Sequence, residues 1–119
     1  MYIQSYKELI VWQKSVILVK EVYIATEKFP KSEMYGLTSQ LRRATISIPS
    51  NIAEGYGRRS KKEFGHFCSV AYGSALEVET QIIICKELNF LGHEEFSALE
   101  ELIEEILKML NSLIAKIKN

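Results

Sequence analysis

The sequence predicts an all-α protein that folds as an up-down-up-down antiparallel four-helix bundle, and three observations lead to this prediction. Helix-breaking residues are scarce, with six glycines and two prolines in 119 residues. Every acidic side chain is a glutamate, which favours helices more than aspartate does. Apolar residues recur at spacings of three and four along four long segments. The length fits one domain over residues 1–119.

The first helix is predicted at about residues 6–28. Its apolar stripe is Leu9, Trp12, Val16, Val19, Tyr23 and Thr26, with spacings of three and four. Phe29 precedes Pro30, and the residue before a proline is pushed out of the helical conformation, so the helix should end there.

The second helix is predicted at about residues 33–57, with Ser32 as its N-cap. Its core stripe is Leu37, Leu41, Ala44, Ile48 and Ile52. Pro49 lies inside this segment and has no N–H to donate to the carbonyl of Thr45. We therefore expect either a kink or two shorter helices broken near residues 47–50.

The last two helices are predicted at about residues 61–89 and 94–117. Ser60 and Glu63 form a capping-box pattern at the start of the third helix, and Asn89 and Gly92 bracket the turn after it. The stripe of the third helix is Phe64, Phe67, Ala71, Ser74, Val78, Ile82 and Cys85. The seam of the fourth is Leu99, Leu102, Ile106, Leu110, Leu113 and Ile117. Short loops between such helices predict the bundle.

Apolar residues also lie off these stripes. They are Ile10, Val11, Ile17, Leu18 and Val22 in the first helix, and Val70, Tyr72, Ile83, Ile84, Ile103, Leu107, Met109 and Ile114 in the last two. These residues make the apolar stripe wider than a single core-facing side needs. The extra width predicts a second buried face, and hence a homo-oligomer. The alternative is a wide core stripe with scattered exposed apolar residues, which is common in monomers.

A polar stripe runs beside the apolar one on the second helix. It consists of Gln40, Arg43, Ser47, Asn51 and Glu54, and Arg58 continues the same spacing. Counting back from the turn near Ser60 places Arg43 near Ser74, Gln40 near Glu77 and Asn51 near His66. These residues, with His66 and Glu77, are predicted to form an inter-helix polar network that fixes register. The alternative is a ligand or partner site.

Six basic residues precede or surround the predicted turn between the second and third helices: Arg42, Arg43, Arg58, Arg59, Lys61 and Lys62. Against Glu54 they give residues 39–62 a net charge of +5, although the whole chain is neutral. Such a cluster can neutralise the phosphates of RNA or DNA, with little sequence specificity. The alternative is a solvated turn.

No catalytic, metal or cofactor site is expected. His66 and His93 form no metal-binding spacing, and the like-charge glutamate pairs in the fourth helix lack a partnering histidine. Cys68 and Cys85 are 17 residues apart on one helix, about 25 Å, too far for a disulfide. The first residues carry no secretory signal pattern and no run is long enough to span a bilayer, so we expect a cytoplasmic protein without membrane contact.

Several blocks of the sequence resemble the four-helix-bundle proteins named after 23S rRNA intervening sequences, also called S23 ribosomal-like proteins. The most specific blocks are residues 40–44 (QLRRA) and 51–55 (NIAEG). The others are residues 9–14, 22–23, 29–30, 33–37, 47–50 and 73–77. The resemblance extends from Tyr6 to about Leu113.

The resemblance implies a ring-like homopentamer and kinship with the accessory protein of diversity-generating retroelements, a pentamer that binds reverse transcriptase and RNA. That relative is markedly basic, whereas this chain has no net charge. From the off-stripe apolar residues, the local basic cluster and the resemblance, we predict a non-enzymatic, homo-oligomeric scaffold that binds structured RNA or other nucleic acid through the basic helix 2–helix 3 end. The alternative is a protein–protein adaptor, docking a polymerase or reverse transcriptase, without nucleic-acid contact of its own.

Overall fold

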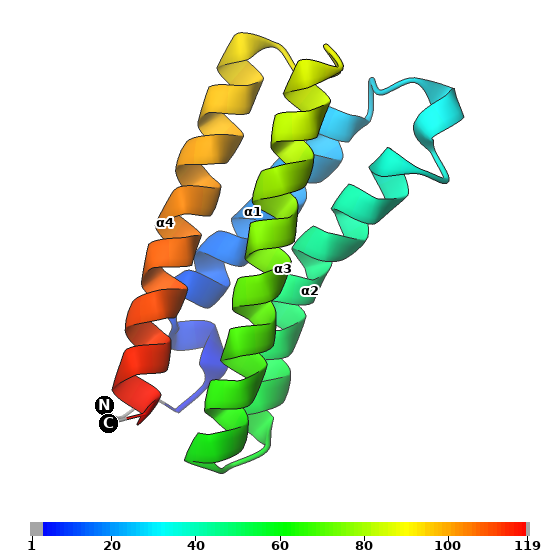
Figure 1. The fold of residues 1–119 in the computed structure, drawn as a ribbon. Coiled ribbons are helices and arrows are strands. Elements are labelled where there is room, and N and C mark those ends of the chain that lie inside the picture. The colour runs from blue at the N-terminus through cyan, green and yellow to red at the C-terminus, as the bar shows by residue number, and fades with distance from the viewer. Residues whose placement is uncertain (1–3, 119) are drawn as a thin grey trace.

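The computed structural model describes residues 4–118, which form four α-helices (Figure 1). The helices are α1 (Ile10–Thr26), α2 (Leu37–Gly57), α3 (Lys61–Glu87) and α4 (His93–Lys118). Two short 3-10 turns, η1 (Tyr6–Glu8) and η2 (Lys31–Glu33), precede α1 and α2. The molecule is elongated, with principal extents of 43 × 24 × 19 Å. No helix within this range is both long and apolar enough to cross a bilayer.

Each helix packs against two others. α2 contacts α1 and α3, and α4 contacts α3 and α1, whereas no Cα atom of α1 lies within 8 Å of a Cα atom of α3. α1 and α3 therefore occupy opposite corners of the bundle. The α1–α2 and α3–α4 connections lie at one end and the α2–α3 turn at the other, so α1 and α3 run in the same direction (Figure 1).

The first helix begins later than predicted. Ser5 and Glu8 form a reciprocal capping box around η1, in which Glu8 Oε2 accepts from the backbone N–H of Ser5 at 3.0 Å. Leu9 then takes an extended conformation before α1 starts at Ile10. The local capping bonds stabilise a separate turn at residues 6–8, so the predicted start at residue 6 was too early. The predicted end at residue 28 was too late, since α1 ends at Thr26.

The inward face of α1 also differs from the prediction. Leu18 and Val22 are fully buried, whereas Val16 and Tyr23 of the predicted stripe are 41% and 38% exposed. Val11, Leu18 and Val22 had been placed off the stripe, but they belong to the core. Apolar residues lie on every side of this helix, so spacing alone did not determine which side faces inward.

α2 begins at Leu37, four residues after the predicted start. Ser32 is therefore not its N-cap, and Gly36 stands there instead. Glu33 supports the start from outside, because its Oε1 accepts from the Leu37 N–H at 3.4 Å. The helix runs unbroken through Pro49, which is buried. The alternative of two shorter helices is wrong.

The two turns around α3 use residues with positive φ. Arg59 (φ 62°) ends α2, and the Ser60 hydroxyl accepts from the Glu63 N–H at 3.1 Å as the predicted N-cap of α3. At the other end Asn89 (φ 64°) follows α3, and the Phe90 N–H donates to the Cys85 carbonyl at 2.8 Å. This bond pattern, with Asn89 in the left-handed region, is a Schellman motif. It stops α3 at Glu87, two residues before the predicted end.

The seam of α4 is close to the prediction. Leu99, Ile106, Leu110, Leu113 and Ile117 are buried, and Leu102 is half-buried. Ile103 is also fully buried, although the sequence placed it off the seam. At the start of α4, a hydrogen bond from Lys28 lowers the pKa of the Glu95 carboxyl, which also caps the Gly92 N–H.

Both cysteines are buried in α3 and should be inert in the folded protein. Burial raises the pKa of the Cys68 thiol to about 12 and that of Cys85 to about 11. Because the thiolate is the reactive form, we expect reaction with Ellman's reagent at pH 8 to be at least about a hundredfold slower than in guanidinium chloride. Rapid labelling of the native protein, measured at 412 nm, would contradict this burial.

Candidate nucleic-acid interface

A polar groove lies between the first half of α2 and the middle of α3. Its volume is about 400 Å³. It is lined by Tyr35, Ser39, Gln40, Arg43, Ala44, Ser47, Ser74 and Glu77. Gln40, Arg43, Ser74 and Glu77 all line this groove, but Ser74 lies opposite Ser47, about one turn from the predicted level of Arg43. The groove is the place where the polar stripe of α2 meets α3.

Hydrogen bonds at one end of this groove connect the two helices. Ser47 Oγ lies 2.8 Å from Ser74 Oγ. Asn51 Nδ2 donates to the carbonyl of Ser47 at 2.8 Å and to its hydroxyl at 2.9 Å. Ser74 is thus the residue of α3 that completes the predicted network, although the sequence placed it in the apolar stripe. Paired hydroxyls at this level favour one register of α2 against α3.

The other predicted members of the network are not joined to it. Glu77 Oε2 accepts from Gln81 Nε2 at 3.2 Å, within α3. Glu54 is paired with Arg58 at 3.0 Å, near the turn. His66 lies away from Asn51, because it shares a second hollow with Lys118 of α4. The predicted placement of His66 beside Asn51 was wrong: counting does not give the side of the helix, and the level was about one turn off, since the residue after His66, Phe67, lies against Gly55.

The six basic residues do not form one surface. Arg42 lies half-buried against α1, where its Nε donates to Thr26 Oγ1 at 2.9 Å and its Cζ lies 4.4 Å from the centre of the Tyr23 ring. Arg43 lines the polar groove. About 15 residues of helix, roughly 20 Å, separate both from Arg58. Only the four residues of the turn remain together at the end of the bundle.

Arg58 has structural partners at this end. Its guanidinium lies 3.0 Å from Glu54, 3.9 Å from Glu63 and 5.2 Å from the centre of the Phe67 ring. These contacts fix the geometry of the turn from α2 into α3. The side chains of Arg59, Lys61 and Lys62 are exposed, and no salt bridge joins them to an acidic residue within residues 4–118.

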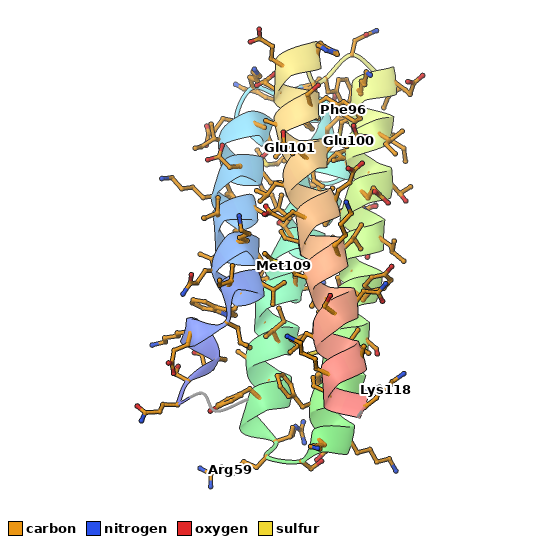
Figure 2. The ribbon with its side chains drawn as sticks, turned by 90° about the vertical axis from the view of Figure 1, so that its left-hand side faces the viewer. Arg59, Phe96, Glu100, Glu101, Met109 and Lys118 are labelled. Atoms are coloured by element: carbon orange, nitrogen blue, oxygen red, sulfur yellow. The ribbon has the colours of Figure 1, made fainter. Side chains whose placement is uncertain are left out.

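α4 contributes a further lysine to this end. Lys118 lines a hollow of about 420 Å³ together with Lys61, Lys62 and His66. We call Arg58, Arg59, Lys61, Lys62 and Lys118 the basic end. Figure 2 shows Arg59 and Lys118 near one end of the bundle, with Phe96, Glu100 and Glu101 toward the other. With Glu54 and Glu63 as the nearby acids, the net charge of the basic end is +3. Lys118 was missed because it is far from the turn in sequence.

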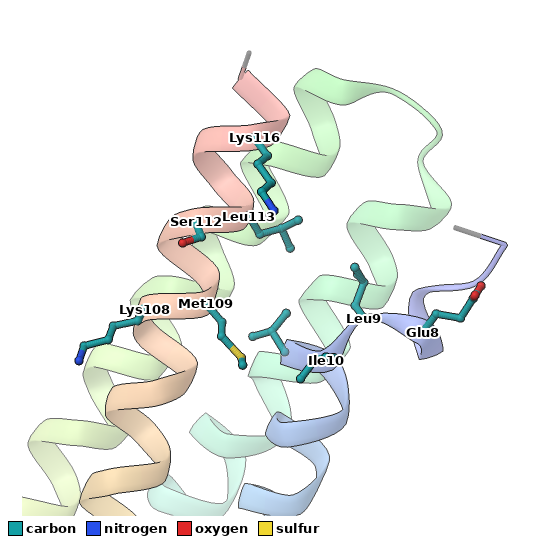
Figure 3. A pocket seen from close by; sticks show the side chains of 9 residues that line it. Glu8, Leu9, Ile10, Lys108, Met109, Ser112, Leu113 and Lys116 are labelled. Atoms are coloured by element: carbon teal, nitrogen blue, oxygen red, sulfur yellow. The ribbon is translucent and has the colours of Figure 1, made fainter. Parts of the chain in front are cut away.

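Two other surfaces are mainly apolar, although Lys108, Lys116 and Glu8 also line the first of them. A hollow of about 440 Å³ between the start of α1 and α4 is largely apolar, and Figure 3 shows Ile10, Met109 and Leu113 around it. At the end opposite the basic one, Tyr35 is 96% exposed and Met34 is 47% exposed. No three His, Cys, Asp or Glu side chains gather as metal ligands within residues 4–118. The basic end is therefore the candidate site for an anionic partner.

The comparisons with known proteins agree with this bundle. The family model of the 23S rRNA-intervening sequence protein matches residues 7–112. The chain belongs to that family. A crystal structure of a protein of unknown function from the S23 ribosomal protein family of Bacteroides thetaiotaomicron has a TM-score of 0.80 against it. The two are 23% identical, over 89% of this chain and 96% of that one, which supports a shared fold. No curated protein matches this family member.

Proposed function

We propose that this member of the family is a non-enzymatic scaffold that assembles from copies of itself and binds structured RNA through the basic end. Up-down bundles would stand side by side in a ring, and the family resemblance implies five copies. The ring would place one basic end from each copy on the same side. Nucleic acid could then contact several copies at once, which raises affinity without requiring strong contacts from any one.

The observation that carries this proposal is the grouping of exposed lysines and arginines from two separate helices at one end of a neutral chain. Arg59 lies in the α2–α3 turn, Lys61 and Lys62 begin α3, and Lys118 ends α4. Ammonium and guanidinium groups bind phosphates and release the counterions around them. A lysine that contacts phosphate makes binding weaken steeply with added salt.

The proposal predicts that Lys61→Ala/Lys62→Ala weakens binding to an RNA hairpin at low salt. We expect the dissociation constant to rise at least about tenfold. The slope of log K against log salt should fall by about one for each lysine that contacts phosphate. Filter binding at several salt concentrations measures both quantities. A matched variant, Lys31→Ala/Lys108→Ala, removes the same charge elsewhere and should bind as the wild type does.

Two results would contradict the RNA-binding part of the proposal. One is wild-type binding that does not depend on salt. The other is equal loss in the matched variant, because the effect would then come from net charge alone. A monomeric wild type in light scattering would contradict the assembly.

A second candidate function is the protein–protein adaptor. The exposed aromatic ring of Tyr35, next to the half-exposed Met34, favours it, because exposed aromatic and methionine side chains are frequent in protein interfaces. This pair lies at the end opposite the basic end. The filter-binding experiment separates the two functions, since an adaptor without nucleic-acid contact retains no RNA at low salt.

A further inference from the structure

We propose that the outer face of α1 in one copy packs into the outer face of α3 in the next copy, in register, so that the copies close into a ring. This inference rests on the self-assembly proposed above. It identifies the two surfaces that make the contact and the positions at which they interlock.

The outer face of α1 carries a ridge of three isoleucines. Ile10, Ile17 and Ile24 are 58%, 50% and 57% exposed. Their spacing of seven residues corresponds to about two helical turns, so the three side chains lie in one line along the helix. We call them the isoleucine ridge. α4 borders one side of this ridge, where the isoleucines line two hollows, and the other half of each side chain is exposed.

The outer face of α3 carries small residues at the same spacing. Gly73 and Thr80 are seven residues apart, and both are exposed. Half-exposed apolar side chains flank them: Val70, Leu76, Ile83 and Ile84 are each 40–43% exposed. A helix face on which short side chains alternate with larger apolar ones is suited to receive side chains from another helix.

Gly73 has no structural reason to be glycine in a single copy. Its φ is not positive, and a Cβ built there meets no atom within 4 Å. Glycine is also among the least favourable residues in the interior of a helix. A neighbour that approaches closely would explain it, because a side chain at this position would fill the space that the neighbour needs.

The spacing of the ridge matches the gaps on α3. When helices interlock, each protruding side chain enters a gap formed by residues i, i+3, i+4 and i+7 of the facing helix. One such gap on α3 is formed by Gly73, Leu76, Glu77 and Thr80. Equivalent gaps lie seven residues before and after it. Three isoleucines at a spacing of seven therefore have three gaps at the same spacing.

α4 gives the relative levels of α1 and α3, because it contacts both. On the α3 side, Gly65 lies at the level of Ile117, and Lys86 lies at the level of Phe96, where its Nζ is 4.4 Å from the ring centre. These two contacts fix the antiparallel register of α3 against α4.

On the α1 side, Ile10 shares a hollow with Met109 and Leu113, and Ile24 shares one with Ala98 and Leu99. The register of α3 against α4 and that of α1 against α4 can be combined. Along the bundle axis, each α1 residue then lies at the same height as the α3 residue about sixty positions later in the sequence. The isoleucine ridge is thus level, to within about a turn, with residues 70, 77 and 84. These are the levels of the three gaps.

Equal levels mean that the contact needs no shift along the bundle axis. A head-to-tail contact with such a shift builds an open filament, whereas one without it can close into a ring. The two faces belong to helices at opposite corners of the bundle, and no Cα atom of α1 lies within 8 Å of one in α3. Each copy can therefore use both faces at once, one toward each neighbour.

The charges beside the two faces are complementary. Lys20 lies one turn above Ile17 on α1, and Glu77 borders the middle gap on α3. Neither forms a salt bridge within residues 4–118. In the proposed contact the ammonium of Lys20 comes within reach of the Glu77 carboxylate. This pair favours a second copy of this chain as the occupant over an unrelated apolar helix.

The test uses two variants that each disable one face. Ile17→Glu places a charge on the ridge, and Gly73→Arg fills the middle gap. By light scattering at tens of micromolar we expect the wild type to be oligomeric and each variant to be monomeric. The controls Ile46→Glu and Gly57→Arg change exposed positions off both faces and should retain the wild-type mass. Circular dichroism confirms that each variant is folded.

Mixing the two monomeric variants is the decisive measurement. The Ile17→Glu copy retains an intact α3 face and the Gly73→Arg copy retains an intact ridge. The mixture should therefore form a one-to-one dimer and nothing larger. Gly73→Ala should assemble more weakly than the wild type. Its dilute monomer should have a higher melting temperature than the wild-type monomer, because alanine favours the helix more than glycine does.

Several outcomes would overturn the inference while leaving self-assembly intact. One is that either variant has the wild-type mass, and another is that the mixed variants remain monomers. If only Ile17→Glu is monomeric, the contact joins two α1 faces instead. A monomeric wild type is a different result, because it removes the proposed assembly itself.

Discussion

Leu18→Ala is expected to destabilise the protein by about 2–5 kcal/mol, because truncation of a fully buried leucine leaves a cavity that the bundle cannot close completely. The position also tests the orientation of α1. The sequence stripe placed Val16 in the core, whereas the structure buries Leu18 and Val22 and leaves 41% of Val16 exposed. The free energy of unfolding from urea denaturation measures the loss.

Val16→Ala is the control for this measurement. It removes a smaller, partly exposed side chain from the same helix, so we expect a loss below about 1 kcal/mol. If Val16→Ala were the more damaging of the two, α1 would face the core with the side that the sequence stripe predicted. The comparison should be made at equal protein concentration, because assembly stabilises a folded subunit.

Gly55→Ala is the second substitution with a large expected effect, about 1–3 kcal/mol of destabilisation. A Cβ on Gly55 would lie 2.6 Å from the Cβ of Phe67 and 3.3 Å from the carbonyl oxygen of Phe64. Neither atom is the mobile end of a side chain, so α2 and α3 must move apart near their turn. Thermal unfolding followed by circular dichroism would show a lowered melting temperature.

Gly57→Ala provides the contrast, two residues later in α2. A Cβ there meets nothing within 4 Å. The melting temperature should be unchanged or slightly raised, since alanine favours the helix. Equal effects at the two positions would mean that α2 and α3 do not approach closely at Gly55. The contrast assigns a packing role to the last residue of the NIAEG block.

The helices most readily predicted from the sequence are those with a clear difference between their sides. In α4 the glutamates alternate with leucine and isoleucine, so its seam could be assigned almost completely. α1 has apolar residues around its whole circumference, and the assembly surface proposed above explains why: the ridge and the core stripe share one helix. The spacing of apolar residues indicates a helix there, but it does not show which of two apolar sides faces the core.

The candidate site was partly predictable for a similar reason. Counting from the Ser60 turn placed Arg43, Gln40, Ser74 and Glu77 near one another, and the groove contains all four, although Ser74 lies opposite Ser47, one turn from Arg43. Counting could not show that His66 points toward α4, because it gives no rotation about the helix axis. It also could not find Lys118, which joins the basic end through tertiary packing between α3 and α4 alone. For Arg42 the error is the opposite one: the sequence assigned it to the basic surface, whereas its side chain packs against α1 within its own bundle.

The Ser5–Glu8 turn and the last turn of α4 lie at the same end of the bundle as Arg59. Tyr6 packs against Tyr56, and Ile117 lies beside Gly65. An affinity tag or fluorescent protein fused beyond either of these segments would crowd the lysines and mask their ability to retain RNA. Untagged protein, or a small dye at residue 35 on the far tip, is the material with which to measure what this end binds.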